Sequence, residues 1–303
     1  MTIKDYAVII NKRLEQLLPE RFETEKPEGN TVPWLLGNSM RYSAVAGGKR
    51  LRGALLMAAA KMLGGDEKEA LEFACALEMI HTYSLIHDDL PGMDNDTLRR
   101  GRPTNHVVFG EGQAILAGDG LLSYAAEHMC DTALASEKNA DGCLLAMKCI
   151  LKGAGISGMV AGQVIDLYSE REKLSDEGLL DYIQLNKTAA MIVSPCKAGC
   201  ALAGYTENSP EMQAMAVYGE NLGKCFQTVD DILDVISDPA TLGKSIGKDA
   251  EEGKLTAVSL YGLDGAREKA KQYTEQAVSA LSIFGDKAAF FTGLAEDMLT
   301  RVS

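Results

Sequence analysis

Two acidic clusters stand out in this sequence because no basic residue lies near them in the chain. The first contains Asp88, Asp89 and Asp94, within the stretch "LIHDDLPGMDND" at 85–96, and no Lys or Arg occurs from Glu69 to Leu98. Carboxylate oxygens are the ligands that hard divalent cations prefer in proteins. We therefore predict a divalent-metal site at these three aspartates, with Mg²⁺ as the favoured ion.

A helix over 66–89 is predicted to carry this first cluster, because Pro91 and Gly92 follow directly and stop the helical pattern. Asp88 and Asp89 would then lie in its last turn. Carboxylates are unfavourable at the negative end of a helix unless a cation is supplied. A plain acidic surface turn is the alternative, but the turn at 91–92 can bring Asp94 back toward Asp88, which favours a metal site.

The second cluster contains Asp230, Asp231 and Asp234, within "QTVDDILDVISD" at 227–238. Asp230 and Asp234 are four residues apart, so they share a helix face and repel each other. No Lys or Arg occurs from Cys225 to Gly243. An ordinary amphipathic surface helix would account for this segment taken alone. Two isolated acidic clusters in one chain make metal binding the stronger interpretation.

Basic residues flank both acidic clusters. Because Mg²⁺ in proteins is usually completed by substrate phosphates, these residues are candidates for holding polyphosphate groups. In chain order they are Lys49, Arg52, Arg99, Arg100, Lys187, Lys244, Lys248 and Lys254. The pattern predicts two anionic substrates, one bridged through metal and one contacted directly by Lys and Arg.

The elements that must position these residues are helices. Apolar residues recur at three- and four-residue steps, and Gly- or Pro-containing breaks separate the runs. After a first segment that ends at Pro19, the runs cover about 32–46, 50–63, 66–89, 111–135, 139–156, 158–171, 176–204, 209–237, 253–281 and 286–301. No alternating β pattern and no linker is evident, so we expect one all-α domain spanning 1–303.

Composition narrows the classes of protein to which the chain could belong. Its formal net charge of −13 makes it a poor candidate for nucleic-acid binding through bulk attraction to phosphate. Its 7 cysteines form no CxxC motif, which predicts reduced thiols in a reducing compartment. Because the N-terminus lacks a signal-peptide core and no stretch approaches the length of a membrane span, we expect a cytoplasmic protein without such a span.

Taken together, the motifs resemble those of the polyprenyl synthase family of trans-isoprenyl diphosphate synthases, and within it the bacterial farnesyl diphosphate synthases. The matching motifs, in the family's order, are "GGKRLR", "EMIHTYSLIHDDLPGMDNDTLRRGRPTNH", "GDGLL", "GMVAGQVIDL", "NKTAAMI", "FQTVDDILDV" and "LGKSIGKD". Glu78 and His81 also spell the ExxH pair of di-iron proteins, but no second ExxH occurs, so we set that chemistry aside.

The resemblance implies an all-α bundle around a deep central cavity. The two Asp-rich motifs would face each other across its mouth and bind Mg²⁺, or alternatively Mn²⁺, on the allylic diphosphate, with Asp230 as the chief ligand of the second motif. The residues that match the allylic diphosphate site are Arg99, Lys187, Lys244 and Lys254. The residues that match the isopentenyl diphosphate site are Lys49, Arg52, His81 and Arg100.

The implied reaction is the head-to-tail condensation of isopentenyl diphosphate with an allylic diphosphate such as dimethylallyl or geranyl diphosphate. Arg99 and Lys187 would hold the leaving diphosphate. The Thr188 hydroxyl, the Gln227 side chain and the Lys187 carbonyl resemble the groups that stabilise the allylic cation through their dipoles. The released pyrophosphate would take the proton, so no protein base is needed.

Tyr83 and Ser84 are the candidates for control of product length. Tyr83 lies five residues before Asp88, about 7.5 Å along a regular helix, so its ring could form a floor to the chain pocket. In bacterial-type relatives an aromatic residue here is typical of farnesyl producers, whereas geranylgeranyl producers carry a smaller or more flexible residue. Ser84 is small and would block little. The alternative is that Tyr83 is merely a core residue.

Three alternatives to farnesyl diphosphate synthesis remain open: geranylgeranyl diphosphate synthesis, a class I terpene cyclase, and an inactive regulatory subunit. A cyclase has no use for a second diphosphate site, and an inactive subunit tends to lose an Asp-rich motif, whereas both are intact here. The resemblance also implies a homodimer. The family's basic C-terminal tail is absent from the end "MLTRVS", so closure of the site by the C-terminus is in doubt.

Overall fold

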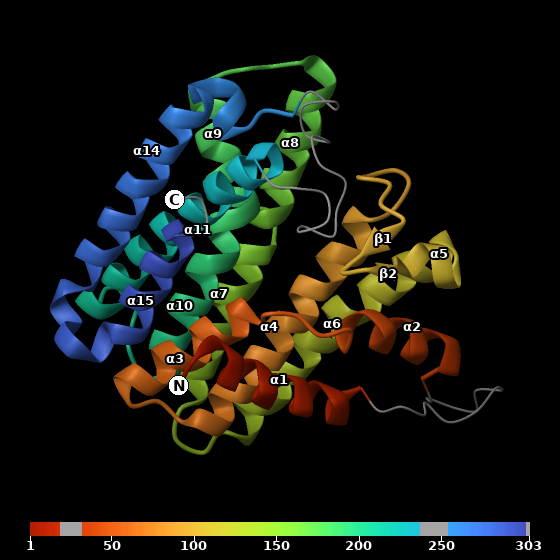
Figure 1. Cartoon of the computed structure of the whole chain (residues 1–303). Helices are drawn as coiled ribbons and strands as arrows, with labels where there is room; N and C mark the ends of the chain where they lie inside the picture. Colours follow the sequence, from red (N-terminus) through yellow and green to blue (C-terminus); the bar gives the residue numbers. More distant parts are fainter. Residues whose placement is uncertain (19–31, 237–253, 301–303) are drawn as a thin grey trace. The chain divides into compact units, whose positions relative to one another are not determined.

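The protein is built almost wholly from helices (Figure 1), as seen in a computed structural model that describes residues 1–18, 32–236 and 254–300. The only strands among the described residues are β1 (Leu98–Arg99) and β2 (Arg102–Pro103), which pair antiparallel. The predicted all-α fold class is therefore confirmed. Lys244, Lys248 and the C-terminal Arg301 lie outside the described residues.

The chain falls into two compact units: Met1–Met57 with Glu67–Cys143, and Ala58–Asp66 with Leu144–Ser303. The expectation of one domain over 1–303 around a central cavity stays a prediction. The helices of the first unit are α1 (Ile3–Leu17), α2 (Trp34–Ala44), the start of α3 (Leu51–Leu63), α4 (Glu67–Asp88), α5 (Asn105–Phe109), α6 (Glu111–Ala135) and the start of α7 (Ala140–Ala154).

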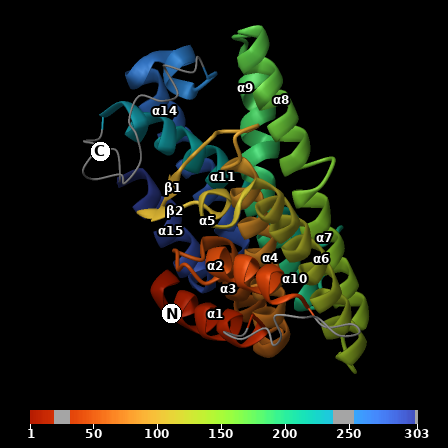
Figure 2. The same ribbon diagram turned by 90° about the vertical axis from the view of Figure 1, so that its right-hand side faces the viewer.

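Helix α4 is the core of the first unit and carries the first acidic cluster at its end. It packs along α6, and Phe73, Leu77 and Ile80 are fully buried. The β1–β2 hairpin and α5 follow its C-terminal turn and lie beside each other (Figure 2). Because apolar packing fixes α4 along most of its length, the residues at its C-terminal end are held on a rigid support.

The second unit is organised around α11 (Pro210–Ile236), which packs between α10 (Ala190–Leu202) and α14 (Ala257–Ala280) (Figure 1). Val229 and Ile232 of α11 are fully buried against α14, and the buried hydroxyl of Tyr218 donates to the carbonyl of Phe291 at 2.9 Å. The remaining elements are α8 (Met159–Glu172), α9 (Glu177–Ile183), η1 (Gln184–Ala189), η2 (Leu281–Ala288) and α15 (Ala289–Thr300).

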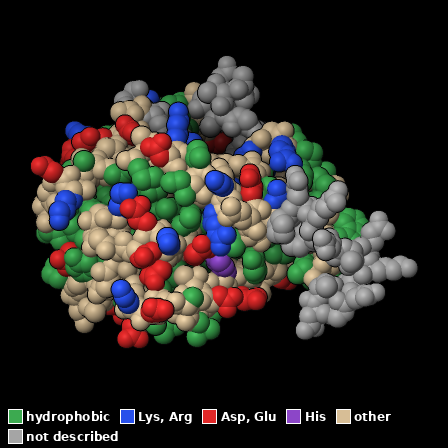
Figure 3. Space-filling view, turned by 90° about the horizontal axis from the view of Figure 1, so that it is seen from below, with side chains coloured by type: hydrophobic (Ala, Val, Ile, Leu, Met, Phe, Trp, Pro, Cys, Tyr) green, Lys and Arg blue, Asp and Glu red, His purple; other side chains and the backbone are tan. Residues whose placement is uncertain are grey.

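One helical stretch qualifies the expectation that no segment could cross a membrane. Residues Ala140–Glu172 are long and apolar enough by length and composition alone, with a mean hydropathy of 1.5 in the most apolar window. A turn at 155–158 divides this stretch into α7 and α8. It is weak evidence for a span, because core helices can pass the same test. On the face drawn in Figure 3, acidic and basic side chains of the described residues are interspersed.

Candidate active site

The loop after α4 folds back and brings Asp94 to the end of the helix. The backbone N–H of Asp94 donates to the carbonyl of Asp88 at 2.9 Å, and the N–H of Asn95 donates to the carbonyl of Leu90 at 3.1 Å. Asn95 takes a left-handed backbone conformation with φ 51°, which Asn tolerates better than most residues. The predicted return of Asp94 toward Asp88 is therefore confirmed for the backbone.

Asp89 is engaged by Arg99 of the β1–β2 hairpin. The guanidinium makes a forked contact, with Nε at 2.8 and 3.0 Å from the two carboxylate oxygens and Nη2 at 2.6 Å from Oδ1. Burial raises the pKa of Asp89, and the nearby charges of Asp96 and Asp94 add to this rise, while Arg99 opposes it. The first cluster thus concentrates negative charge at one helix end, where a cation would relieve it.

No three acid, His or Cys side chains of the described residues converge as a ready-made metal cage. Mg²⁺ does not require such a cage, because it keeps several waters and is usually bound by one or two carboxylates plus substrate phosphates. The backbone hydrogen bond from Asp94 to Asp88 brings two residues with carboxylate side chains to the same turn. The donor chemistry therefore fits an Mg²⁺ ion that binds together with a diphosphate.

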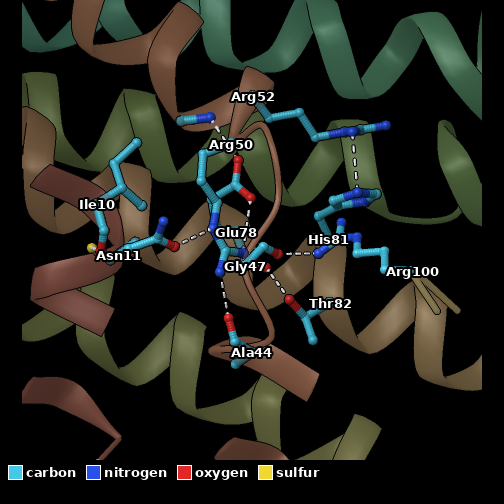
Figure 4. A network of polar contacts seen from close by, with 12 residues as sticks. Ile10, Asn11, Ala44, Gly47, Arg50, Arg52, Glu78, His81, Thr82 and Arg100 are labelled. Atoms are coloured by element: carbon cyan, nitrogen blue, oxygen red, sulfur yellow. Dashed lines mark hydrogen bonds and ion pairs between the residues drawn. The ribbon is translucent and has the colours of Figure 1, made fainter. Parts of the chain in front are cut away.

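A second group of predicted residues comes together at the start of α3, where the loop of residues 45–50 meets α4. Nη1 of Arg52 lies 3.2 Å from Nε2 of His81 (Figure 4). Arg100, from the hairpin, donates to the carbonyl of Gly47. Gly48 has a φ of 140°, a backbone conformation that residues with side chains rarely adopt, and a Cβ there would also stand 2.7 Å from the Arg100 guanidinium. The exposed Lys49 follows in the same loop.

The electrostatics of this basic group keep His81 neutral. Burial lowers the pKa of His81 well below its usual range, and the positive charges of Arg52 and Arg100 lower it further. A neutral imidazole accepts at one nitrogen and donates at the other. Because Arg52 can only donate, Nε2 of His81 is the accepting nitrogen. The structure thus brings Arg52 and His81 into contact and places Arg100 against the loop that carries Lys49.

In the second unit the three aspartates of α11 differ from one another. Asp231 is buried, and both of its oxygens are used: Oδ1 accepts from Nε2 of Gln227 at 2.9 Å, and Oδ2 accepts from the backbone N–H of Ala257 at 2.8 Å. The second of these bonds holds the first turn of α14. Asp230 and Asp234 are partly exposed. Sequence analysis counted all three acids as ligands, with Asp230 as the chief one, and the structure separates Asp231 from the other two by its burial and its two hydrogen bonds.

The residues predicted to stabilise a cation form a connected chain of hydrogen bonds. The Thr188 hydroxyl donates to Oε1 of Gln227 at 2.7 Å, and the amide of Gln227 donates to Asp231. Thr188 and Lys187 belong to η1, which is wound as a π-helix, a form common at functional sites. Gly162 of α8 packs so tightly on the Lys187 backbone that a Cβ there would overlap it.

One pocket of the second unit gathers several of these predicted residues. Lys187, Gln227, Asp231 and Lys254 all contribute to its lining. The complete lining is Asp166, Leu180, Ile183, Gln184, Lys187, Gln227, Asp231, Lys254, Leu255 and Thr256. Lys254, 67 residues from Lys187 in the chain, was assigned to the same substrate group by resemblance alone, and the structure places both in this pocket.

Asp166 is a site residue that sequence analysis missed. Its Oδ2 lies 2.5 Å from Nζ of Lys187. It lies within "GMVAGQVIDL", which was quoted as a motif but given no role. The available signal was an acid in an otherwise apolar run, four residues after Gly162. An acid in such a position needs a charged partner, and Lys187 is that partner.

Tyr83 is buried in α4, next to α6. Its ring meets the His87 ring edge-on, with centroids 5.7 Å apart, and Nε2 of His87 lies 3.0 Å from the carbonyl of Ile115. Gly118 of α6 leaves room for the His87 ring, since a Cβ there would overlap it. The hydroxyl of Ser84 donates to the carbonyl of His81 at 2.9 Å. This packing fixes the Tyr83 ring, and its role as a pocket floor stays a prediction.

The first Asp-rich motif belongs to one compact unit and the second motif to the other. Their predicted meeting across a cleft therefore stays a prediction. The same holds for the metal-ligand and substrate-contact roles of the individual residues.

Residues 33–284 match the family described as polyprenyl synthetase. A geranylgeranyl diphosphate synthase of Cyanophora paradoxa is 40% identical over 289 residues, which cover 95% of this chain and 94% of that protein. The large subunit 1 of a heterodimeric chloroplastic geranylgeranyl pyrophosphate synthase of Arabidopsis thaliana is 43% identical over 298 residues, covering 97% of this chain and 77% of that protein.

Two solved structures show the same fold. An FPP/GFPP synthase of Zymomonas mobilis has a TM-score of 0.83 and 31% sequence identity, covering 98% of this chain and 97% of that one. A geranyltransferase of Legionella pneumophila has a TM-score of 0.83 and 32% identity, covering 99% of this chain and 96% of that one.

Proposed function

The chain belongs to the polyprenyl synthetase family, and from this premise we propose that it condenses isopentenyl diphosphate head-to-tail with dimethylallyl and geranyl diphosphates to give farnesyl diphosphate. Prenyl chain elongation is the family-level activity. The farnesyl product, the metal and the residue roles are the proposal. The observation that supports condensation is the basic group at the start of α3, which consists of Lys49, Arg52, His81 and Arg100. A second diphosphate site is needed for condensation and has no use in cyclisation.

In this proposal Lys49, Arg52, His81 and Arg100 bind isopentenyl diphosphate. The fork of donors on an arginine guanidinium matches the oxygens of a phosphate group. The contact between Arg52 and His81 orients that fork, because the neutral imidazole accepts one of its N–H groups at 3.2 Å. The lowered pKa of His81 supports this arrangement, since a protonated imidazole could not accept.

The allylic diphosphate binds next to the acidic clusters and ionises there. Mg²⁺, or alternatively Mn²⁺, would be held by Asp88 and Asp94 at the first acidic cluster and by Asp230 and Asp234 at the second. It would supply positive charge that neutralises the leaving diphosphate. Asp89 holds Arg99 in place by the forked contact described above. Arg99, Lys187, Lys254 and Lys244, the last outside the described residues, supply further positive charge.

The allylic cation would be stabilised by oxygen dipoles that the fold orients in advance. The Thr188 hydroxyl donates its hydrogen bond to Oε1 of Gln227, so the lone pairs of the Thr188 oxygen remain to face the cation. The bond from Gln227 to Asp231 fixes the side-chain amide. The isopentenyl double bond attacks the cation, and the proton then lost goes to the released pyrophosphate.

The buried Tyr83 supports a farnesyl product, because a ring in this position limits the depth available to a growing chain. A geranylgeranyl product is the second candidate, supported by the names of the relatives from Cyanophora paradoxa and Arabidopsis thaliana. Incubation with labelled isopentenyl diphosphate and dimethylallyl diphosphate, followed by chromatography of the products, tests both. A longer product excludes the farnesyl assignment, and no condensation at all excludes the proposed function.

We further propose a homodimer in the cytoplasm. The family resemblance supports the dimer, and the adjacent exposed side chains of Ile115 and Leu116 on α6 would gain stability if a second copy covered them. None of the seven cysteines, which all lie in the described part of the chain, forms a disulfide, and this supports a reducing compartment. Light scattering of the purified protein tests the dimer, and cell fractionation tests the location. A monomer by light scattering would contradict the first of these.

A further inference from the structure

An ion pair is buried behind the basic group at the start of α3. Nη1 of Arg50 lies 3.5 Å from Oε2 of Glu78, and the two side chains are only 2% and 3% exposed (Figure 4). Two buried charges are costly unless each is paired and further hydrogen-bonded. Neither residue belongs to the proposed substrate contacts, so the pair needs another explanation.

Glu78 uses its second oxygen to hold the beginning of α3. Oε1 accepts from the backbone N–H of Gly53 at 2.9 Å. The N–H groups in the first turn of a helix have no partner within the helix, and a carboxylate there is favoured by the helix dipole. A Cβ on Gly53 would stand 2.8 Å from Cδ1 of Ile10 and 3.3 Å from Cγ of Glu78. Gly53 thus permits α3 to approach α4 this closely.

Arg50 holds the loop that precedes α3. Its backbone is left-handed, with φ 49°, which is uncommon for a residue with a side chain. Its guanidinium donates to Oδ1 of Asn11 in α1 at 2.8 Å and to the carbonyl of Ala44 at the end of α2 at 2.6 Å. Together with Glu78 of α4, these acceptors fix the guanidinium from three helices, as Figure 4 shows.

The contacts of Arg50 and Glu78 also fix the positions of neighbouring residues of the basic group. Lys49 immediately precedes Arg50, and Arg52 lies in the first turn of α3, so both follow the position of the anchored segment. His81 lies three residues after Glu78, on the same side of α4. One carboxylate therefore sets the distance between the start of α3 and the His81 turn, across which Arg52 contacts His81 at 3.2 Å.

We infer that Glu78 and Arg50 are positioning residues for isopentenyl diphosphate: they hold Lys49, Arg52 and His81 in the arrangement that receives the diphosphate, without touching it. This inference rests on the proposed function. Donors that must converge on one phosphate group lose much of their effect when they are misplaced by about 1 Å. A purely electrostatic role for Glu78 makes the opposite prediction, because removing a negative charge near Arg50 and Arg100 would tighten diphosphate binding.

The test is the Michaelis constant for each substrate, measured separately in the variant Glu78→Gln. This variant keeps the shape of the side chain but leaves Arg50 without its counter-charge. We expect the KM for isopentenyl diphosphate to rise about tenfold, while the allylic KM and the kcat at saturating substrate stay within about twofold of wild type. A KM for isopentenyl diphosphate that is unchanged or lower, in a folded variant, overturns the inference.

Glu72→Gln is the matched control. Glu72 also belongs to α4 and pairs with Arg13 at 2.9 Å and His128 at 2.8 Å, away from the α3 loop. It should leave the ratio of the two Michaelis constants unchanged. An equal shift of that ratio in Glu72→Gln would mean a general effect of charge loss on α4, and would overturn the inference.

Because Glu78→Gln could fail to fold, Asn11→Ala provides a milder second variant. It removes a single acceptor of the Arg50 guanidinium. We expect the KM for isopentenyl diphosphate to rise about threefold, again with the allylic KM unchanged. An unchanged KM for both substrates in this variant counts against the inference. If the wild-type protein does not consume isopentenyl diphosphate at all, the proposed function fails instead, so the two failures can be told apart.

Discussion

Nζ of Lys187 lies 2.5 Å from Oδ2 of Asp166, and this ion pair joins the π-helical segment η1 to α8. Both side chains are partly buried, at 26% and 13% exposed, so water screens the pair less than it screens a surface pair. The pair holds the Lys187 ammonium group at the pocket that Gln227 and Lys254 also line. Lys187 is therefore oriented before any diphosphate binds.

Asp166→Asn should release Lys187 from this orientation. The ammonium would keep its charge but lose its fixed place, and we expect kcat to fall about 100-fold, the order typical of a misplaced catalytic group. The measurement is steady-state condensation at saturating substrates. Glu207→Gln is the control, because Glu207 pairs with Lys148 at 3.4 Å on the surface of the same unit. If both variants keep wild-type kcat, the ion pair has no part in catalysis.

Tyr83→Ala should lengthen the product. Removing the ring opens a space beside the His87 ring, on the side of α4 that faces α6. Chain growth would then continue from farnesyl to geranylgeranyl diphosphate or beyond. Truncation of a buried aromatic side chain also costs about 3–5 kcal/mol of stability, so the assay is best run well below the unfolding temperature. Chromatography of the labelled products is the measurement.

Ser84→Ala is the matched control for product length. It removes only a hydroxyl that donates to the carbonyl of His81 within the helix. We expect it to leave the product unchanged. A Tyr83→Ala enzyme that still stops at the wild-type length would show that Tyr83 is a core residue and no floor.

Local patterns were sufficient for the fold class and for the first acidic loop. The three- and four-residue spacing of apolar residues predicts helices because each helix buries one stripe. Pro91 and Gly92 predict the turn after α4, because proline cannot continue a helix, and the turn returns Asp94 to Asp88. These features depend on residues close in sequence.

Features that depend on distant residues could not be predicted in the same way. Sequence analysis gave one helical run over 176–204, whereas the structure divides it into α9, η1 and α10. The π-helical winding of η1 coincides with close packing against Gly162, more than twenty residues earlier in the chain. Asp231 and Glu78 each bind a backbone N–H about twenty-five residues away, and no local spacing reveals such a partner.

Comparing Asp231→Asn with Asp230→Asn should show that Asp231 supports the stability of the fold, whereas Asp230 supports the dependence of activity on Mg²⁺. Asn at 231 would lose the charge that receives the N–H of Ala257 and would weaken the start of α14, so we expect a loss of about 1–3 kcal/mol in the free energy of unfolding. Asp230 is partly exposed, and its replacement should change stability little while raising the Mg²⁺ concentration needed for half-maximal activity. Denaturant unfolding and a Mg²⁺ titration measure the two effects. Equal stability of both variants would contradict the anchoring role of Asp231.

The neutral state of His81 predicts a loss of stability in mild acid. Burial, with the positive charges of Arg52 and Arg100, lowers its pKa in the folded protein well below the ordinary value of 6.5. In the unfolded chain the imidazole takes up a proton near that ordinary value, so protons favour unfolding. The stability linked to His81 is therefore present above about pH 6.5 and is lost as the pH falls from there toward the folded pKa.

Denaturant unfolding of the wild type and of His81→Gln across this range measures the effect. The amide of Gln can still accept from Arg52 but does not titrate. We expect the free energy of unfolding of the wild type to fall more steeply than that of His81→Gln between about pH 7 and pH 5. The extra fall grows with the difference between the unfolded and the folded pKa of His81. Condensation assays over the same range should show no change in the KM for isopentenyl diphosphate that depends on His81, because the folded protein keeps the imidazole neutral. Parallel stability curves for the two proteins would mean that His81 titrates normally and that the basic group around it does not hold it neutral.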